Sequence, residues 1–228
     1  MLAHVCSQVG VKKIVFSSTG GAIYPESARP PCSEKVVPEP LSPYGISKRS
    51  AEMYLRFAYQ VHGLPYVALR YANVYGPRQN AKGEAGVISI FIESMLKGKP
   101  TIINGTGKQT RDFVHVDDLS DAIHKIINSK SQNDIFNIGA GKAESILNLK
   151  NIISHKRDHI FLEKRNDDIE ISISNINKIK KRLFWKPKIS FKNGVKEIEK
   201  LDKIRLSRFN LPSVKQQQKL IKKFNKKK

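Results

Sequence analysis

The chain has 228 residues, a mass of 25.8 kDa and 39% hydrophobic residues, which suits one α/β domain with a hydrophobic core. No run approaches the roughly 18 apolar residues of a membrane span, and the N-terminus has no signal-peptide pattern, so neither a membrane protein nor a secreted one is indicated. Cys6 and Cys32 lack metal-ligand spacing and predict reduced thiols, no metal site and a cytoplasmic location.

The net charge of +21 is concentrated in the last third of the chain. Residues 151–228 hold 23 Lys and Arg against 8 Asp and Glu, and residues 201–228 read as a basic, flexible tail. Such a charge could attract nucleic acid, but no aromatic residues alternate with the basic ones and no nucleic-acid motif accompanies them. We interpret the excess as solvated charge and expect no nucleic-acid partner.

The first elements predict a helix end followed by a strand. Leu2 to Gly10 reads as the end of a helix, and Lys13 to Ser17 as a buried parallel strand. Ser17-Ser18-Thr19 then stands at the carboxyl end of that strand, where the ligand sites of α/β sheets lie. The proline-rich segment from Tyr24 to Pro40 predicts a surface loop.

A helix that carries two chemically useful side chains follows. Ser42 is a suitable N-cap, Pro43 suits the first turn, and Gly63 ends the helix. Tyr44 and Lys48 are four residues apart and share one helix face. An ammonium near a phenol favours the phenolate, which can accept a proton. A Tyr-x-x-x-Lys pair alone is more often a surface contact, so its interpretation depends on the neighbouring motifs.

The remaining pattern alternates strands and helices. His115, in an alternating strand, and Trp185 are expected to be structural, and Asp117-Asp118 is expected to cap a helix. The expected strands are Tyr66–Tyr71, Asp134–Gly139 and a short strand with its turn over Thr101–Gly107. The expected helices are Ile88–Leu96, Leu119–Ile127, Ile146–Ile153, Asn175–Leu183 and Val195–Leu201.

Four motifs in order give the chain a family likeness. They are Val15-Phe16-Ser17-Ser18-Thr19, Pro43-Tyr44-Gly45-Ile46-Ser47-Lys48, Leu69-Arg70-Tyr71-Ala72-Asn73-Val74-Tyr75-Gly76-Pro77-Arg78-Gln79 and Gln109-Thr110-Arg111-Asp112-Phe113-Val114-His115-Val116-Asp117-Asp118. The series resembles the extended short-chain dehydrogenase/reductase family, in particular its NAD-dependent nucleotide-sugar epimerases and dehydratases of the UDP-glucose 4-epimerase type. The likeness extends from about Val11 to Trp185.

The resemblance implies an α/β fold, with a doubly wound, Rossmann-like parallel sheet and a smaller C-terminal substrate-binding α/β part. Residues 1–80 would be the C-terminal portion of the NAD-binding domain, and residues 81–200 mainly a substrate-binding region with some returning Rossmann elements. The family carries a Gly-rich strand–turn–helix for the cofactor pyrophosphate, yet no G-x-x-G-x-x-G precedes Val15. We therefore expect the first βα units, on the order of 90 residues, to be missing from this sequence.

The same resemblance assigns roles to the motif residues. Thr19, Tyr44 and Lys48 take the catalytic positions, with Ser18 as the alternative hydroxyl if the register is off by one. The residues implied for NAD binding are Ser17, Ser18, Tyr44, Lys48, Tyr71 and Ala72. The residues implied for substrate binding are Thr19, Asn73, Val87, Ile88, Arg111 and Arg165. Judged without the motifs, Asn73 would be a turn residue, and Arg111 a surface ion pair with Asp112 or Asp117.

The reaction implied is NAD-dependent epimerisation of a nucleotide-sugar, a UDP-hexose, at C4 through a 4-keto intermediate, in a homodimer formed through the helix of Tyr44. Gly20-Gly21 stands where related dehydratases carry an Asp-Glu pair, which favours an epimerase. Two alternatives remain open within the fold: a nucleotide-sugar reductase or decarboxylase, and an inactive remnant that acts as a binding module. A basic nucleic-acid binder is a third alternative.

Overall fold

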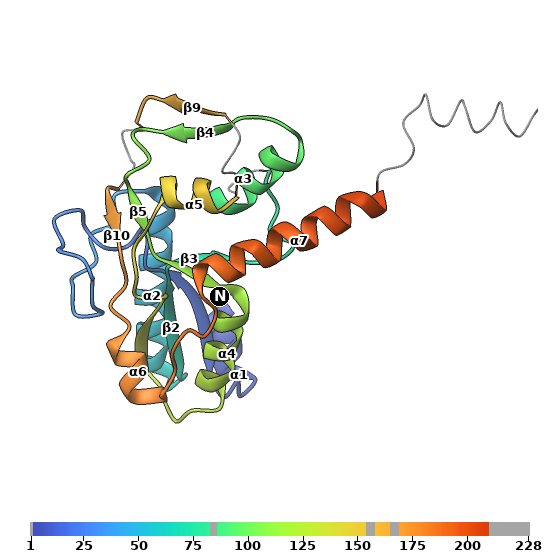
Figure 1. Ribbon diagram of the computed structural model, residues 1–228. Coiled ribbons are helices and arrows are strands. Elements are labelled where there is room, and N and C mark those ends of the chain that lie inside the picture. Colours follow the sequence, from blue (N-terminus) through green and yellow to red (C-terminus); the bar gives the residue numbers. More distant parts are fainter. Residues whose placement is uncertain (1, 83–85, 154–157, 165–168, 210–228) are drawn as a thin grey trace, which may run out of the picture.

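The computed structural model describes residues 2–82, 86–153, 158–164 and 169–209 (Figure 1). The helices are α1 (Leu2–Gln8), α2 (Pro43–His62), α3 (Val87–Leu96), α4 (Val116–Ile127), α5 (Ile146–Ile153), α6 (Asn177–Leu183) and α7 (Phe191–Phe209). The strands are β1 (Ile14–Thr19), β2 (Tyr66–Tyr71), β3 (Asn73–Tyr75), β4 (Thr101–Asn104), β5 (Thr110–Arg111), β6 (Phe113–His115), β7 (Asp134–Ile138), β8 (Glu144–Ser145), β9 (His159–Leu162) and β10 (Ile171–Ser172).

A parallel sheet in the order β1-β2-β7 forms the centre of the larger part of the molecule. Alternate residues of β2 point to opposite faces. Ala68 packs toward Leu55 of α2, whereas Leu69 packs in the cluster that contains Ala122 of α4 and Ile179 of α6. The sheet therefore has helices on both faces, as the doubly wound fold class predicts.

β1 is parallel, as expected, but only its last two residues, Ser18 and Thr19, are buried. Ile14, Val15 and Phe16 are only half-buried, whereas Val67 and Leu69 of β2 are fully buried. The difference arises because β1 pairs only with β2 within the described residues and so lies at an edge of the sheet. Its start is held in place by Lys13, whose Nζ donates to the carbonyl of Ile126 at 3.2 Å and to that of Ser129 at 2.7 Å, at the C-terminus of α4.

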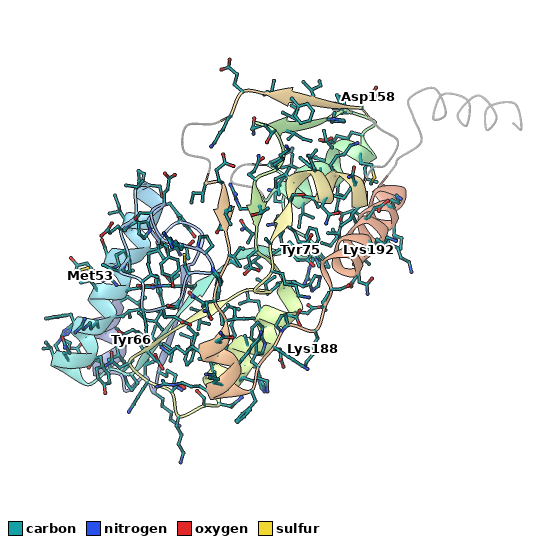
Figure 2. The ribbon with its side chains drawn as sticks, turned by 60° about the vertical axis from the view of Figure 1, so that its left-hand side comes forward. Met53, Tyr66, Tyr75, Asp158, Lys188 and Lys192 are labelled. Carbon is teal, nitrogen blue, oxygen red and sulfur yellow. The ribbon has the colours of Figure 1, made fainter. Side chains whose placement is uncertain are left out.

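The helix of Tyr44 and Lys48 has the predicted signals at both ends. The Ser42 Oγ accepts a bond of 3.0 Å from the Gly45 amide, and Gly63 ends the helix with a φ of +65°. Leu55 and Ala58 on its inner side are buried. Met53 and Phe57 are more than half exposed, and Figure 2 shows Met53 at the periphery of the molecule.

A second hydrophobic cluster joins α3, α5, α7, β4 and β6, with the parallel pair β4–β9 at the far end of the molecule (Figure 1). The expected helix from Val195 to Leu201 was too short, because α7 begins at Phe191 and continues to Phe209, away from the rest of the fold. Gly194 lies inside it. A Cβ at this position would stand 2.4 Å from the hydroxyl of Tyr75, so the helix approaches Tyr75 closely only because residue 194 is glycine.

The start of α4 differs from the expectation that Asp117-Asp118 caps it. The cap is His115, whose Nδ1 accepts from the Asp117 amide at 3.3 Å. Asp118 is instead buried and accepts from the amides of Lys188 and Ile189 at 2.9 and 3.0 Å. Trp185 is 1% exposed and donates its indole N–H to the Asp118 carbonyl, which agrees with the structural role expected for it. None of the described helices is both long and apolar enough to cross a membrane.

Candidate functional site

A cavity of about 460 Å³ lies at the carboxyl ends of β1 and β2, beside the first turn of α2 and the N-terminus of α3. Proteins with α/β folds bind ligands at the carboxyl ends of the strands of their parallel sheets. Figure 2 shows one of its lining residues, Tyr75, deep inside the molecule. The lining residues are Ser18, Thr19, Gly21, Ala22, Tyr44, Tyr71, Ala72, Asn73, Val74, Tyr75, Gln79, Gly86, Val87, Ile88 and Phe113.

Thr19 and Ser18 end β1 at this cavity, and their hydroxyls differ in what they bind. The Thr19 Oγ1 accepts a bond of 3.2 Å from the Gly21 amide, which leaves its proton for another acceptor. The Ser18 Oγ donates to the Glu52 carboxylate at 2.6 Å. Thr19 is therefore the better placed of the two hydroxyls to donate into the cavity, which favours the register in which it is the catalytic residue.

Tyr44 reaches the same cavity from the first turn of α2 and is 50% exposed. The Lys48 Nζ, one turn later, donates to the Ser17 carbonyl at 2.9 Å. It also lies 5.7 Å from the centre of the Tyr44 ring and 5.3 Å from that of Phe16. The ammonium is therefore held between the end of β1 and the phenol ring.

The end of β2 and the start of β3 supply further predicted residues. The Tyr71 hydroxyl and the Ser17 Oγ are 3.1 Å apart. Burial raises the pKa of Tyr71, and the bond to Ser17 opposes this only in part. Asn73 lies in β3, and its side-chain amide donates to the Asp112 carbonyl at 3.1 Å. Tyr71, Ala72 and Asn73 all line the cavity, so the structure brings together these candidates for cofactor and substrate contact.

Val87 and Ile88 line the cavity from the N-terminus of α3. The residue that precedes them, Gly86, is the N-cap and makes no side-chain capping bond. A Cβ on Gly86 would stand 2.8 Å from the side-chain amide of Gln79, so only glycine fits there without displacing that side chain. A helix N-terminus is favourable for anions, which suits the substrate contact expected at Val87 and Ile88.

Arg111, one of the two arginines expected to bind the substrate, is not brought to the cavity. The Arg111 Nη1 donates to the carbonyls of Thr110 and Ile169, and Arg111 does not line the cavity. Arg165 lies outside the described residues.

Asp112 was considered only as an ion-pair partner of Arg111, and the structure gives it another role. Its carboxylate is buried and accepts from the amides of Ala140, Gly141 and Ser174 at 2.7, 3.1 and 3.2 Å. Burial raises its pKa to about 6, although the three amides oppose the rise. Asp112 thus holds the turn after β7 against the chain that follows β10.

A buried ion pair beneath the site was not expected. Arg70 Nε and Nη2 donate to the two carboxylate oxygens of Glu52 at 2.9 and 2.7 Å, and both side chains are 1% exposed. Burial acts to raise the pKa of Glu52, but the bonds from Arg70 and Ser18 outweigh it and hold that pKa below its usual value. Arg70 Nη1 also donates to the Tyr24 hydroxyl, which in turn donates to Asn137.

Comparison with known proteins agrees with this geometry. A sequence profile described as the NAD dependent epimerase/dehydratase family matches residues 1–139. The chain belongs to this family. Within the described residues of this family member, no group of three or more His, Cys, Asp or Glu side chains is placed to hold a metal ion.

Individual relatives are similar over most of the chain. A provisionally named UDP-glucose 4-epimerase of Methanocaldococcus jannaschii is 45% identical over 192 residues, which are 82% of this chain and 62% of the relative. The UDP-glucose 4-epimerase of Mycolicibacterium smegmatis is 34% identical over 85% of this chain and 63% of its own. This member of the epimerase/dehydratase family thus spans less than two thirds of these curated relatives.

Solved structures show the same fold. The Thermotoga maritima UDP-glucose 4-epimerase with UDP-glucose superposes with a TM-score of 0.86 at 43% identity, over 90% of this chain and 68% of that one. The Thermus thermophilus UDP-glucose 4-epimerase in complex with NAD superposes with a TM-score of 0.78 at 36% identity, over 87% of this chain and 66% of that one. The Rossmann-like α/β fold expected from the sequence is therefore confirmed.

Proposed function

We propose that this chain carries the catalytic and sugar-facing residues of an NAD-dependent UDP-hexose 4-epimerase. The observation that supports it is the meeting of Thr19 and Tyr44 at one cavity, with Lys48 fixed beside the Tyr44 ring. The names of the relatives with 45% and 34% identity favour UDP-glucose as the sugar.

The polar groups on the α2 side of the cavity fit the ribose end of a dinucleotide. Ser17 and Tyr71 form a hydroxyl pair at the carboxyl end of the sheet, and Lys48 brings an ammonium to the same strand end. Ala72 adds an apolar wall. These residues, with Ser18 and Tyr44, would hold NAD. When bound, NAD supplies the reversible acceptor for a hydride from the sugar.

The chain's own residues handle the proton. The Tyr44 phenolate accepts the proton of the C4 hydroxyl as that carbon is oxidised, and it returns the proton when the 4-keto sugar is reduced on its other face. Thr19 donates a hydrogen bond to the same sugar oxygen and orients it. The Lys48 ammonium stabilises the phenolate, since it is held beside the ring.

The nucleotide end would be held on the opposite side of the cavity. The α3 N-terminus at Val87 and Ile88 suits the diphosphate, and Asn73 suits a polar group of the sugar or of the diphosphate. Arg111 and Arg165 remain part of the proposal, and contact with the diphosphate would require Arg111 to leave its bonds to Thr110 and Ile169.

The test is turnover of UDP-glucose by the purified chain with added NAD, followed by separation of the sugar products. Tyr44→Phe should abolish UDP-galactose formation, while Tyr54→Phe should not, because Tyr54 is an exposed tyrosine on the same helix outside the cavity lining. A Tyr44→Phe chain that retains the wild-type rate would overturn the mechanism.

A different reaction on the same site has some support. Among the relatives, a dTDP-4-dehydro-6-deoxyglucose reductase of Escherichia coli is 30% identical and a UDP-N-acetyl-alpha-D-glucosaminuronate decarboxylase of Bacillus cytotoxicus is 32% identical. UDP-glucose labelled with deuterium at C4 separates the cases. An epimerase keeps the label at C4 of the product. A reductase would leave UDP-glucose unchanged and consume reduced cofactor only with a 4-keto nucleotide-sugar, and a decarboxylase would release carbon dioxide only from a nucleotide-linked uronic acid.

Assembly, location and domain division belong to the same proposal. The exposed apolar side chains Met53, Tyr54 and Phe57 of α2 would form a homodimer interface. Both cysteines are free thiols, which suits a cytoplasmic protein. Residues 1–80 would belong to the cofactor domain and 81–200 mainly to the substrate region, while most of the tail, residues 201–228, lies outside the described residues.

A further inference from the structure

Glu52 extends the row of Tyr44 and Lys48 along α2. It lies one turn after Lys48 and two turns after Tyr44, so the three share a helix face. Lys48 is partly exposed and does not itself line the cavity, whereas Glu52 is 2% exposed. The proposed catalytic helix is thus anchored by a buried charge directly below its lysine.

The Glu52 carboxylate joins the helix to the two strands that end at the cavity. It accepts from Ser18 in β1 at 2.6 Å and, through both oxygens, from Arg70 in β2. Ser18 lies between the residue whose carbonyl holds Lys48 and the catalytic candidate Thr19. Two consecutive turns of α2 therefore bind two consecutive residues at the end of β1: Lys48 binds Ser17 and Glu52 binds Ser18.

We propose that Glu52 is a positioning residue for the proposed reaction, acting through Ser18. Its bond to Ser18 fixes the position of α2 along its axis relative to β1. This position determines the contact of the Lys48 ammonium with the Ser17 carbonyl and the placement of Tyr44 relative to Thr19. The inference rests on the proposed function for its catalytic meaning, but the contact between Lys48 and Ser17 can be measured without turnover.

The stabilising role of Glu52, through its ion pair with Arg70, can be separated from its positioning role, through its bond to Ser18. Arg70 satisfies both carboxylate oxygens and holds the charge in the interior, so loss of Glu52 or Arg70 also leaves a buried charge unpaired. Apart from its proposed contact with NAD, Ser18 contributes only the link between strand and helix, and a measurement without cofactor isolates that link. Ser18→Ala removes that link and leaves the pair of Glu52 and Arg70 intact, so it tests the positioning role with little cost to folding.

The experiment follows the Lys48 ammonium by NMR in the purified chain, without cofactor or sugar. The signal is assigned by its loss in Lys48→Arg. A lysine ammonium that is held on a carbonyl exchanges slowly with water, and a released one exchanges too fast to be seen. We expect the signal in the wild type and in the control Arg49→Ala, which removes a bond of 3.3 Å to the same carboxylate from the partly exposed side.

We expect the Lys48 signal to be absent in Ser18→Ala and in Glu52→Gln. We expect it to be present in Ser18→Thr, because threonine keeps a hydroxyl donor. If Glu52→Gln does not fold, the two Ser18 variants carry the test. An unchanged Lys48 signal in folded Ser18→Ala would overturn the proposal. Where the wild type turns over UDP-glucose, Ser18→Ala should also lower kcat by about 10- to 100-fold with little change in KM. An inactive wild type would count against the proposed function and leave the NMR result standing.

Discussion

Gly45, the residue after Tyr44, offers a sharp test of how the first turn of α2 is packed. A Cβ at this position would stand 2.2 Å from the carbonyl oxygen of Ala22 and 2.8 Å from the Cβ of Pro40. The oxygen is backbone and the carbon belongs to a rigid ring, so neither can rotate away. Gly45→Ala must therefore displace either the loop or the start of the helix that carries Tyr44.

Two effects of opposite sign decide the magnitude. Alanine favours a helix over glycine by about 1 kcal/mol, which would stabilise the variant. Overpacking of a rigid site costs about 1–3 kcal/mol and occasionally more, and a contact of 2.2 Å belongs at the upper end. We expect Gly45→Ala to lower the free energy of unfolding by about 2 kcal/mol.

Urea unfolding followed by circular dichroism measures this loss. Gly21→Ala is the matched control for stability, because a Cβ there meets nothing within 4 Å and φ at Gly21 is not positive. We expect that control to stay within about 0.5 kcal/mol of the wild type. A Gly45→Ala chain as stable as the wild type, or more so, would show that the loop at Ala22 and Pro40 does not pack against α2 as described.

Three further predictions concern residues away from that turn. Burial raises the pKa of Asp112 from 3.8 to about 6, so the folded chain holds this proton more tightly than the unfolded chain. The resulting stabilisation is fully present below the pKa of the unfolded chain and is lost as the pH rises through about 6. The free energy of unfolding should change by about 3 kcal/mol across this range. Asp112→Asn should remove this component, so urea titrations near about pH 4 and about pH 7 should show the wild type losing stability relative to the variant, and parallel curves would contradict the assignment. Trp185→Phe removes a fully buried ring and its bond to the Asp118 carbonyl, and thermal unfolding should show a loss of about 2–3 kcal/mol; a loss below about 0.5 kcal/mol would be inconsistent with that packing. Phe57→Lys on the outer side of α2 should convert the proposed dimer to a monomer in analytical ultracentrifugation, whereas Lys203→Ala on α7 should not, and a wild type that sediments as a monomer would dismiss the interface.

Local signals predicted the helix of Tyr44 and Lys48 well. The Ser42 cap, Pro43 and Gly63 act through bonds and backbone angles within a few residues, so the sequence carries them directly. The same holds for β2, whose expected bounds were Tyr66 and Tyr71. The exposure of β1 could not be foreseen in this way, because an apolar strand reads alike whether one or both of its edges are paired.

The buried pair of Glu52 and Arg70 left a signal that was not used. Tyr66 and Ala68 share a face of β2, and Arg70 continues that face after a run of apolar residues. A charge on the buried side of a central strand requires a partner, and the helix packed there carries Glu52 on its inner side. Asp112 had no comparable signal, because its three amide donors come from segments distant in sequence.

The length of α7 was missed because Gly194 resembled a helix boundary. Its glycine serves the approach to Tyr75 and not the end of a helix. Tertiary contact of this kind cannot be read from local propensity, since the partner lies far away along the chain.

Within the described residues β1 lies at an edge of the sheet, which has a practical consequence for handling this chain. Strand edges with open amides and carbonyls can join edge to edge between copies, which leads to precipitation. A net charge of +21 holds copies apart, and added salt weakens that repulsion. Concentrated stocks should therefore keep best in dilute buffer, contrary to the common practice of storing very basic proteins in high salt.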